Sequence, residues 1–350
     1  MSSSTSPKKS TTKPSQPSAP RFTRNSAPHG AKMDTLIRGG KVTTQESQSL
    51  PRYVLITPAR NEEDFIEKTL ESMIQQTAPP IRWVIVDDGS SDRTADIVER
   101  YAKSYPWIEL VRHPQRKERN FAGKVNAFNE GFKRIQNLQF AFVGNLDADI
   151  SFGPDHFEYL LKKLQGDKAL GVVSTAYTQD DWDSTKDSFE GQVSAAGACQ
   201  LFRYGCFVDI GGYSASPAGG IDWIAVTTAR MRGWKTRNYP ERRFHHHRTM
   251  GTANRSEVGA AFAFGAKDYL LGGSPVWEVL RSAYRMTQKP IVIGGVALFL
   301  GYCWSAFRRV ERPVSSEFMR FHRQEQMKKL RMIFGSLIRL RRVDKYLPAE

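Results

Sequence analysis

The feature that most constrains the fold is an alternation of short apolar runs and amphipathic helical patterns that begins at Tyr53. The apolar runs have the length and character of strands buried on both faces of a parallel sheet. The segments between them carry apolar residues at the spacing of helices that cover such a sheet. Strands are predicted at 53–57, 81–86, 108–111 and 140–145, and helices at 62–76, 92–103 and 124–136. The pattern predicts an α/β fold with a mostly parallel, doubly wound sheet flanked by helices.

Acidic residues follow three of these strands where the strands end. The loops are Pro-Ala-Arg-Asn-Glu-Glu at 58–63, Asp-Asp-Gly-Ser-Ser-Asp at 87–92, and Asp-Ala-Asp at 147–149. Ligands of open parallel sheets bind at the C-terminal ends of the strands, so we expect these carboxylates to lie together. They would repel one another unless a cation or hydrogen-bond donors stood among them. Asp-x-Asp oxygens suit Mg²⁺ or Mn²⁺, hard ions that also bind diphosphate oxygens.

Four segments of the chain resemble motifs of the family 2 glycosyltransferases, which have the GT-A fold. They are residues 57–63, 84–92, 123–131 and 147–149, and the resemblance covers about residues 53–250. It implies a GT-A catalytic domain with a Rossmann-like nucleotide-binding sheet. It also implies transfer of a sugar from a nucleotide-diphosphate sugar, a UDP- or GDP-sugar, to an acceptor with inversion at the anomeric carbon.

The resemblance also implies which residues bind the nucleotide of the donor. Asp88, the second Asp of its pair, would hydrogen-bond the base. Lys124 would face the nucleotide, where its ammonium group offsets the charge of the diphosphate. The alternative for Lys124 is a surface lysine of a helix. The residues that would line the nucleoside pocket are Pro58, Ala59, Arg60 and Glu62.

A metal site is implied at the Asp-Ala-Asp segment. Asp147 and Asp149 would hold the metal and the donor sugar, with Asp149 as the more direct ligand. The expected cofactor is Mg²⁺ or Mn²⁺, acting as a Lewis acid on the leaving nucleoside diphosphate. Three consecutive histidines occupy 245–247, and His247 is expected to complete the metal shell. Arg248 would contact the diphosphate. The alternative for each histidine is a partly buried structural side chain.

The second half of the domain is expected to bind the acceptor. Residues 197–213 are similar to the acceptor-side segment of the family, which ends in a Gly-Gly-aromatic turn. The family usually has Glu-Asp a few residues later, with the Asp as catalytic base. This chain has Ile221 in the Glu position but keeps Asp222. Because an inverting transfer needs one base opposite the leaving group, Asp222 is the predicted catalytic residue. The alternative for Asp222 is a helix cap.

The formal net charge of +15 is unevenly distributed along the chain. Residues 1–50 hold 8 Lys and Arg against 2 Asp and Glu, and 274–350 hold 15 against 6, whereas residues 51–273 hold 28 of each. A nucleic-acid-binding domain would carry its basic stripe on the folded body, so nucleic acid is not an expected partner. The predicted organisation is a disordered basic tail at 1–50, a catalytic domain at 51–273, and a basic amphipathic and hydrophobic helical region at 274–350.

Residues 290–307 contain no charge and have basic residues on both sides. Eighteen uncharged residues are at the lower limit for a membrane-spanning helix. Basic flanks on both sides favour a segment that inserts from one face of an anionic membrane surface. A single span and a helix packed in a soluble protein are the alternatives. The expected location is the cytoplasmic face of the cell membrane, with a lipid-linked or glycan acceptor used in surface polysaccharide or glycolipid biosynthesis.

Two other enzyme activities are the rival predictions. One is a glycosyltransferase with a soluble acceptor. The other, from a different enzyme class, is a sugar-nucleotide nucleotidyltransferase, which usually begins with a Gly-rich phosphate loop; the first loop here contains no glycine. The three cysteines cannot form a disulfide framework and have no metal-type spacing, which fits a reducing compartment.

Overall fold

The computed structural model describes residues 50–115, 122–180, 182–185, 191–216, 219–248 and 256–338. The basic tail predicted at 1–50 therefore lies outside the described residues, apart from Leu50. The strands are β1 (Tyr53–Ala59), β2 (Arg82–Asp87), β3 (Ile108–Arg112), β4 (Phe142–Leu146), β5 (Ile150–Phe152), β6 (Leu170–Gln179), β7 (Trp182–Asp183), β8 (Cys199–Arg203) and β9 (Lys235–His246).

Helices alternate with the strands in the first half and continue alone at the end of the described chain. They are α1 (Ile66–Ile74), α2 (Thr94–Ser104), α3 (Gly123–Ile135), α4 (His156–Gly166), α5 (Tyr204–Asp209), α6 (Ile221–Met231), α7 (Glu257–Leu270), α8 (Pro275–Arg285), α9 (Ile293–Phe307) and α10 (Ser316–Ile338). A short 3₁₀ helix, η1, spans Gly191–Val193. The predicted α/β architecture is confirmed, with the first four strands and three helices placed within a few residues.

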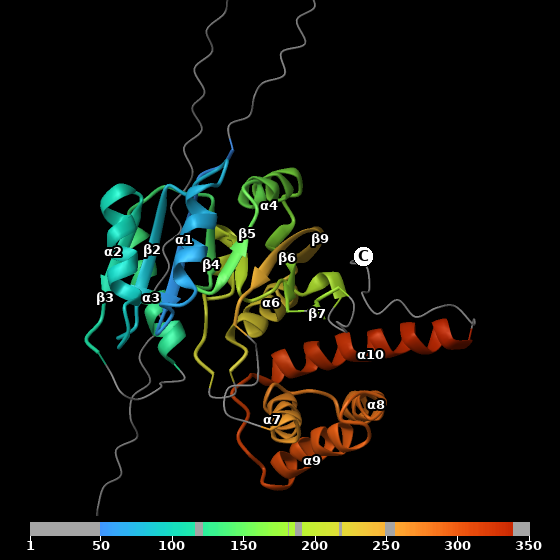
Figure 1. Ribbon diagram of the computed structural model, residues 1–350. Helices are drawn as coiled ribbons and strands as arrows, with labels where there is room; N and C mark the ends of the chain where they lie inside the picture. Colours follow the sequence, from blue (N-terminus) through green and yellow to red (C-terminus); the bar gives the residue numbers. More distant parts are fainter. Residues whose placement is uncertain are drawn as a thin grey trace, which may run out of the picture. The chain divides into compact units, whose positions relative to one another are not determined.

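The sheet has the order β3-β2-β1-β4-β8-β6-β9-β5, with β7 paired to β6 (Figure 1). Strands β3, β2, β1 and β4 are parallel to one another, as the apolar runs predicted. Strand β8 is antiparallel to both β4 and β6. The sheet is therefore parallel from β3 to β4 and mixed beyond β4. The carboxyl ends of β1, β2 and β4 meet at one edge, where the acidic loops begin.

Both faces of β1, β2 and β4 are buried, which explains the apolar runs in these strands. Tyr53 and Leu55 of β1 face a core with helices α1 and α4. Ile56 faces α3, where a Cβ added to Gly131 would lie 2.7 Å from Ile56 Cγ2. Burial of such side chains provides about 1.5–3 kcal/mol each. The sheet thus forms a rigid base for the loops at its edge.

The last four helices form a group of their own, in which α7 lies along α9 (Figure 1). The two backbones nearly touch, since a Cβ at Gly265 would lie 1.8 Å from the carbonyl oxygen of Leu298. A Cβ at Gly301 would lie 2.0 Å from the carbonyl oxygen of Phe262. Helix α7, with its N-cap at Ser256, precedes the boundary predicted at residue 274 and packs on α9. None of the helices in the described ranges combines the length and apolar composition that crossing a membrane requires.

Helix α10 connects this group to the sheet part of the molecule. It contacts α8 and also α6. The ring of Trp223 packs edge-on against those of Phe318 and His322, with centroids 5.7 and 4.7 Å apart. The guanidinium of Arg230 donates two hydrogen bonds to the carboxylate of Glu325, at 2.7 and 3.0 Å. Helix α6 is therefore held from the side of the C-terminal helices.

The α7–α9 contact predicts that Gly265→Ala destabilises the protein. In an isolated helix Ala is favoured over Gly by about 1 kcal/mol, so propensity alone predicts the opposite sign. The methyl group would force the two backbones apart, and we expect the free energy of unfolding to fall by about 1–3 kcal/mol. Denaturant unfolding followed by circular dichroism measures this. Gly335→Ala in α10 is the matched control, because a Cβ there meets nothing within 4 Å. Equal or greater stability of Gly265→Ala would contradict the packing.

Candidate active site

The loops after β1 and β2 are hydrogen-bonded to each other at the edge of the sheet. The backbone N–H of Asn61 donates to Ser90 Oγ at 3.0 Å, and that of Ser91 donates to Asn61 Oδ1 at 2.9 Å. The N–H of Glu62 donates to Thr94 Oγ1 at 2.7 Å. Asn61 has a positive φ of 54°, a conformation that Asn tolerates better than most residues. These bonds hold the two loops as one surface.

A cavity of about 250 Å³ opens between these loops and the Asp-Ala-Asp segment. Asp88 lines it, whereas the carboxylate of Asp87 is turned inward and accepts a hydrogen bond from the backbone N–H of Ser90 at 3.3 Å. The lining residues are Pro58, Ala59, Arg60, Glu62, Asp88, Lys124, Asp147, Ala148 and Asp149. All the residues expected to bind the nucleotide and its diphosphate line this cavity, except Arg248. Their binding roles stay predictions.

Lys124 and Asp147 form an ion pair at the floor of this cavity. Lys124 Nζ donates to Asp147 Oδ1 at 2.6 Å, and Asn145 Nδ2 donates to the same oxygen at 3.1 Å. Burial acts to lower the pKa of Lys124, but the carboxylates of Asp147, Asp222 and Asp149 outweigh it and raise this pKa. Lys124 is therefore a charged ammonium group aimed at the acidic cluster. The Lys124 side chain lines the cavity, although 39% of it is exposed, and its role toward a nucleotide stays a prediction.

Asp147, Asp149 and His246 form a group that can hold a metal ion. One ligand atom from each lies within 4.8 Å of the others. Strand β5 pairs with β9 so that Ile150 lies opposite His246, which brings the histidine beside Asp149. His246 Nδ1 lies 2.8 Å from the carbonyl oxygen of Arg248, so Nδ1 carries the proton that it donates. In the neutral ring this leaves a lone pair on Nε2, which is 3.7 Å from Asp149 Oδ1.

The donor set fits a divalent cation. Burial raises the pKa of Asp149, and the neighbouring charge of Asp147 raises it further, while His246, Arg248 and Lys124 act to lower it. Two carboxylates and one imidazole lie close enough together for their oxygen and nitrogen atoms to bind one small divalent ion. Oxygen and imidazole donors together suit a first-row ion such as Mn²⁺. The residues present are therefore compatible with the expected cofactor.

His246, and not the predicted His247, lies beside the two aspartates. His247 Nε2 is 2.9 Å from Ser151 Oγ, and its ring stacks on Phe65 with centroids 6.1 Å apart. Burial lowers the pKa of His247 to about 4, and nearby Lys68 adds to this effect. The reason for the difference is the alternation of β9, which turns neighbouring residues to opposite sides. The prediction was one residue out of register.

Arg248 bridges the metal group and the nucleoside loop. Its Nη2 donates to Glu62 Oε2 at 2.5 Å and to the carbonyl oxygen of Asn61 at 3.1 Å. Its Nε lies 3.6 Å from Asp149 Oδ2. Burial raises the pKa of Glu62 to about 7, and the charge of Asp149 adds to this, although Arg248 opposes it. Arg248 therefore stabilises the cluster, and its predicted contact with a diphosphate stays a prediction.

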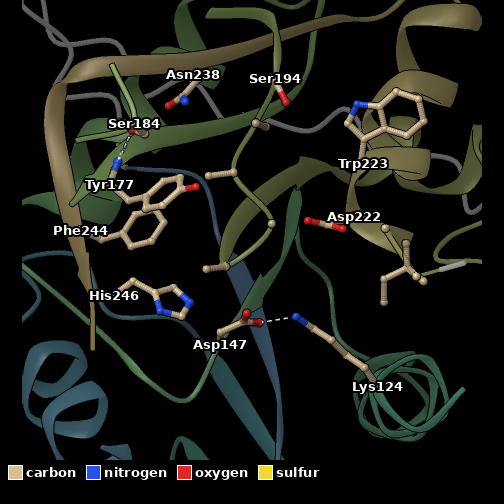
Figure 2. A pocket seen from close by; sticks show the side chains of 17 residues that line it. Lys124, Asp147, Tyr177, Ser184, Ser194, Asp222, Trp223, Asn238, Phe244 and His246 are labelled. Atoms are coloured by element: carbon tan, nitrogen blue, oxygen red, sulfur yellow. Dashed lines mark hydrogen bonds and ion pairs between the residues drawn. The ribbon is translucent and has the colours of Figure 1, made fainter. Parts of the chain in front are cut away.

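A second cavity of about 450 Å³ adjoins the first and shares Lys124 and Asp147 with it (Figure 2). Asp222, at the start of α6, points into this cavity on the side of Lys124 (Figure 2). The other polar and aromatic side chains that line it are Tyr177, Ser184, Ser194, Trp223, Asn238, Phe244 and His246. An acceptor-sized molecule placed here would lie between Asp222 and the floor of the first cavity.

Asp222 is positioned by a close approach of two chain segments. A Cβ on Gly197 would lie 1.8 Å from Asp222 Oδ2, so no larger residue fits there without moving the carboxylate. Gln200 Nε2 lies 3.4 Å from the carbonyl oxygen of Asp222, and Gln200 Oε1 accepts from Tyr213 Oη at 2.6 Å. The N-cap of α6 is Gly220, with φ of 71° and no side-chain capping hydrogen bond. The helix-cap alternative for Asp222 therefore has no support in the described contacts.

Sequence reasoning did not identify His246, Tyr177, Trp223 or Asn238. A signal for His246 was present, because Phe244 is an apolar residue two positions earlier on the same strand, and both are buried. Period-two alternation from Phe244 places His246, not His247, on the inner side. The other three residues carry no motif, and only the folded chain shows that they line one cavity.

Comparison with known proteins gives the family. Residues 54–207 match the family model described as glycosyl transferase family 2. The chain carries a family 2 glycosyltransferase domain. The matched segment includes β1 to β4, the Asp-Ala-Asp segment and β8, and it contains all the residues that line the first cavity. Asp222 and His246 lie beyond the matched residues.

Curated relatives share this glycosyltransferase domain at low identity. The chain is 27% identical over 180 residues to the poly-beta-1,6-N-acetyl-D-glucosamine synthase of Staphylococcus epidermidis, covering 51% of this chain and 39% of that protein. It is 33% identical over 135 residues to the putative teichuronic acid biosynthesis glycosyltransferase TuaG of Bacillus subtilis, covering 39% of this chain and 50% of that protein. The match therefore spans half or less of the length of these relatives.

A solved structure shares the fold over a longer stretch. It is the mannosyltransferase PcManGT from Pyrobaculum calidifontis in complex with GDP-Man and Mn²⁺. The match has a TM-score of 0.51 and 18% identity, and it covers 84% of this chain and 81% of that one. At this identity the likeness shows the fold, which is GT-A.

The metal group predicts different effects for two adjacent histidines. We expect His246→Ala and Asp149→Asn each to weaken Mn²⁺ binding by at least about tenfold, because each removes a ligand atom. His247→Ala is the matched control and should change Mn²⁺ affinity by less than about twofold, since that ring faces Ser151. Titration followed by the electron paramagnetic resonance of free Mn²⁺ measures all three. If His247→Ala weakened binding as much as His246→Ala, the assignment of His246 would be wrong.

Proposed function

We propose that this protein transfers a sugar, with inversion, from a UDP- or GDP-sugar to a lipid-linked acceptor in surface polysaccharide or glycolipid biosynthesis. The observation that carries the proposal is the pair of adjoining cavities that share Lys124 and Asp147. The first has the acidic cluster expected to hold a metal-bound diphosphate. The second has a single carboxylate, Asp222, placed across from that cluster.

The donor would bind in the first cavity. Its nucleoside would lie against the loop that contains Arg60 and Glu62, within reach of Asp88. Lys124 would exchange part of its contact with Asp147 for the diphosphate, since its charge is retained in this setting. A bound Mg²⁺ or Mn²⁺, held by Asp147, Asp149 and His246, supplies Lewis-acid stabilisation of the leaving diphosphate. These residues orient the donor so that its anomeric carbon faces the second cavity.

Asp222 would act as the catalytic base for the acceptor. An inverting transfer requires the acceptor hydroxyl to attack from the side opposite the leaving group while a base takes its proton. In Figure 2 the carboxylate of Asp222 faces the space above the Lys124–Asp147 pair, where that hydroxyl would lie. The proton would move from the hydroxyl to a carboxylate oxygen of Asp222. One carboxylate suffices, which is consistent with Ile221 in place of the usual Glu.

The class of acceptor is supported by two further observations. Two relatives are named for the synthesis of poly-beta-1,6-N-acetyl-D-glucosamine and for teichuronic acid biosynthesis, so the domain occurs in enzymes that build glycan polymers. Helix α6, which carries Asp222 in its first turn, is packed on α10 of the C-terminal helical region. A lipid-linked acceptor held by that region, at the cytoplasmic face of the cell membrane, would reach the second cavity. A soluble acceptor remains the alternative and is tested by offering both kinds.

The direct test is Asp222→Asn. We expect transfer from a panel of UDP- and GDP-sugars to a lipid-linked acceptor to slow by roughly 10²–10⁴-fold, the usual contribution of a general base. Thermal stabilisation by nucleoside diphosphate and Mn²⁺ should be unchanged, because Asp222 does not line the donor cavity. Asp155→Asn, an exposed carboxylate paired with Arg242, is the control and should retain full activity. Inversion is read from the anomeric configuration of the product by nuclear magnetic resonance.

Three outcomes of that test would each overturn part of the proposal. Full activity of Asp222→Asn would show that Asp222 is not the base. Absence of transfer from every nucleotide sugar, with the protein folded and Mn²⁺ present, would remove the glycosyltransferase activity itself. Transfer to water-soluble acceptors alone would leave the activity in place and exclude the lipid-linked acceptor.

A second prediction concerns Gly197→Ala. The added methyl group collides with Asp222 Oδ2 and must displace the carboxylate. We expect kcat to fall by about 100-fold, because a misplacement of about 1 Å has this effect on a positioned catalytic group. Donor stabilisation in thermal-shift assays should stay as in the wild type. Gly205→Ala is the matched control, since a Cβ there meets nothing within 4 Å. Wild-type kcat for Gly197→Ala would mean that this contact does not position Asp222.

A further inference from the structure

Large apolar side chains are exposed in one part of the described structure only. Among the residues described, every exposed large apolar side chain lies between Val258 and Ile338, in α7 to α10 and their connections. The described part of the glycosyltransferase domain, from residue 50 to 248, exposes none. Soluble surfaces rarely gather such residues, and concentrated patches mark sites that bind a protein or a membrane. The helical region therefore has a surface that the sheet part lacks.

Helix α9 is the centre of this surface. Its inner side, with Gly295, Leu298 and Gly301, is buried against α7 and α8. Its outer side is apolar along its whole length, with three- and four-residue spacing. The exposed residues of this side are Ile293 (57%), Val296 (39%), Phe299 (37%), Leu300 (53%), Trp304 (54%) and Phe307 (80%). Ile291 and Val292, just before the helix, extend it and are 63% and 53% exposed. We call these eight residues the α9 face.

Basic residues stand at both ends of the α9 face. Lys289 precedes it, and Arg308 and Arg309 follow it directly, all of them exposed. The guanidinium of Arg308 lies over the ring of Trp304, 5.7 Å from its centroid. Within α9 there is no acidic residue and no basic one. The pattern is an apolar stripe with cationic ends, which matches the boundary between the acyl chains and the anionic headgroups of a bilayer.

We propose that the α9 face docks on an anionic phospholipid bilayer, with α9 lying in the plane of the interface. The 15 residues of α9 give a length of about 22 Å along the membrane surface. The apolar side chains would enter the acyl boundary, and Lys289, Arg308 and Arg309 would contact headgroup phosphates. Trp304 has the amphipathic ring that is enriched at this depth.

Charge favours a bilayer over a second copy of the chain as the occupant. A symmetric dimer through the α9 face would bring the same surface of both copies together. Residues 274–350 carry 15 Lys and Arg against 6 Asp and Glu, so two copies would repel. Glu325 is already paired with Arg230, and Glu278 is buried, so neither offsets the surface charge. An anionic lipid surface complements both the apolar and the basic parts.

The test is co-sedimentation of the full chain with lipid vesicles. We expect binding to vesicles of phosphatidylcholine with about one third phosphatidylglycerol, and at least about tenfold weaker binding to phosphatidylcholine alone, because the cationic ends need anionic headgroups. Raising the salt from about 0.1 to 0.5 M should weaken binding by screening. The readout is lipid binding without sugar transfer, so it does not depend on the proposed function.

Two variants separate the apolar and basic contributions. Leu300→Glu with Trp304→Glu places charges in the middle of the α9 face, and Arg308→Glu with Arg309→Glu reverses one basic end. We expect each pair to weaken binding to anionic vesicles by at least about tenfold. Lys133→Glu with Arg134→Glu, an exposed basic pair at the end of α3, is the matched control and should bind as the wild type does. Thermal unfolding of each variant confirms that it is folded. Arg308 and Arg309 are exposed, so the basic pair tests the proposal even if the apolar pair misfolds.

Three results would overturn the proposal. One is no binding of the wild type to anionic vesicles. Another is equal binding to neutral and anionic vesicles, which would exclude the anionic headgroups. The third is a dimer in solution that the Leu300→Glu and Trp304→Glu pair dissociates, which would show that a second copy covers the α9 face.

Discussion

The site depends on how the mutual repulsion of carboxylates at one edge of the sheet is offset by positive charge. Glu62, Asp147 and Asp149 come from two loops that the parallel strands bring together, and burial strengthens the repulsion by removing water. Lys124 from α3 pairs with Asp147. Arg248, just after β9, pairs with Glu62 and lies 3.6 Å from Asp149. The protein's own cations thus hold the acidic edge together. The same balance suits the edge to two kinds of ligand. The carboxylates complement a divalent cation, and the side chains of Lys124 and Arg248 complement an anionic diphosphate.

The C-terminal helices contribute to the site without lining it. Helix α6 carries Asp222 in its first turn and Arg230 in its last, and α10 contacts it through Trp223 and through the bidentate Arg230–Glu325 pair. The exposed fraction of the Arg230 side chain is 11%, so this pair is better shielded from solvent than a surface ion pair. The orientation of α6, and with it the direction of Asp222, therefore depends on packing against α10. This helix lies more than one hundred residues along the chain from the acidic loops.

Much of the fold and part of the site could be predicted from the sequence, for physical reasons that differ between elements. The strands β1 to β4 were predicted because burial on both faces requires continuous apolar runs, and the acidic loops followed from where those runs end. Strand β8 was not predicted, since Cys199–Arg203 has no alternation or apolar run that distinguishes it from a loop. The approach of Gly197 to Asp222 could not be predicted either, because it depends on how α6 packs against the segment before β8.

The Lys124–Asp147 ion pair, which lines both cavities, has a thermodynamic consequence for ligand affinity. A ligand that draws Lys124 away from Asp147 in the first cavity also changes the charge that faces Asp222 in the second. Occupancy of one cavity is then coupled to affinity in the other, and by linkage the coupling factor is the same in both directions. Two ligands, one in each cavity, would therefore not bind independently.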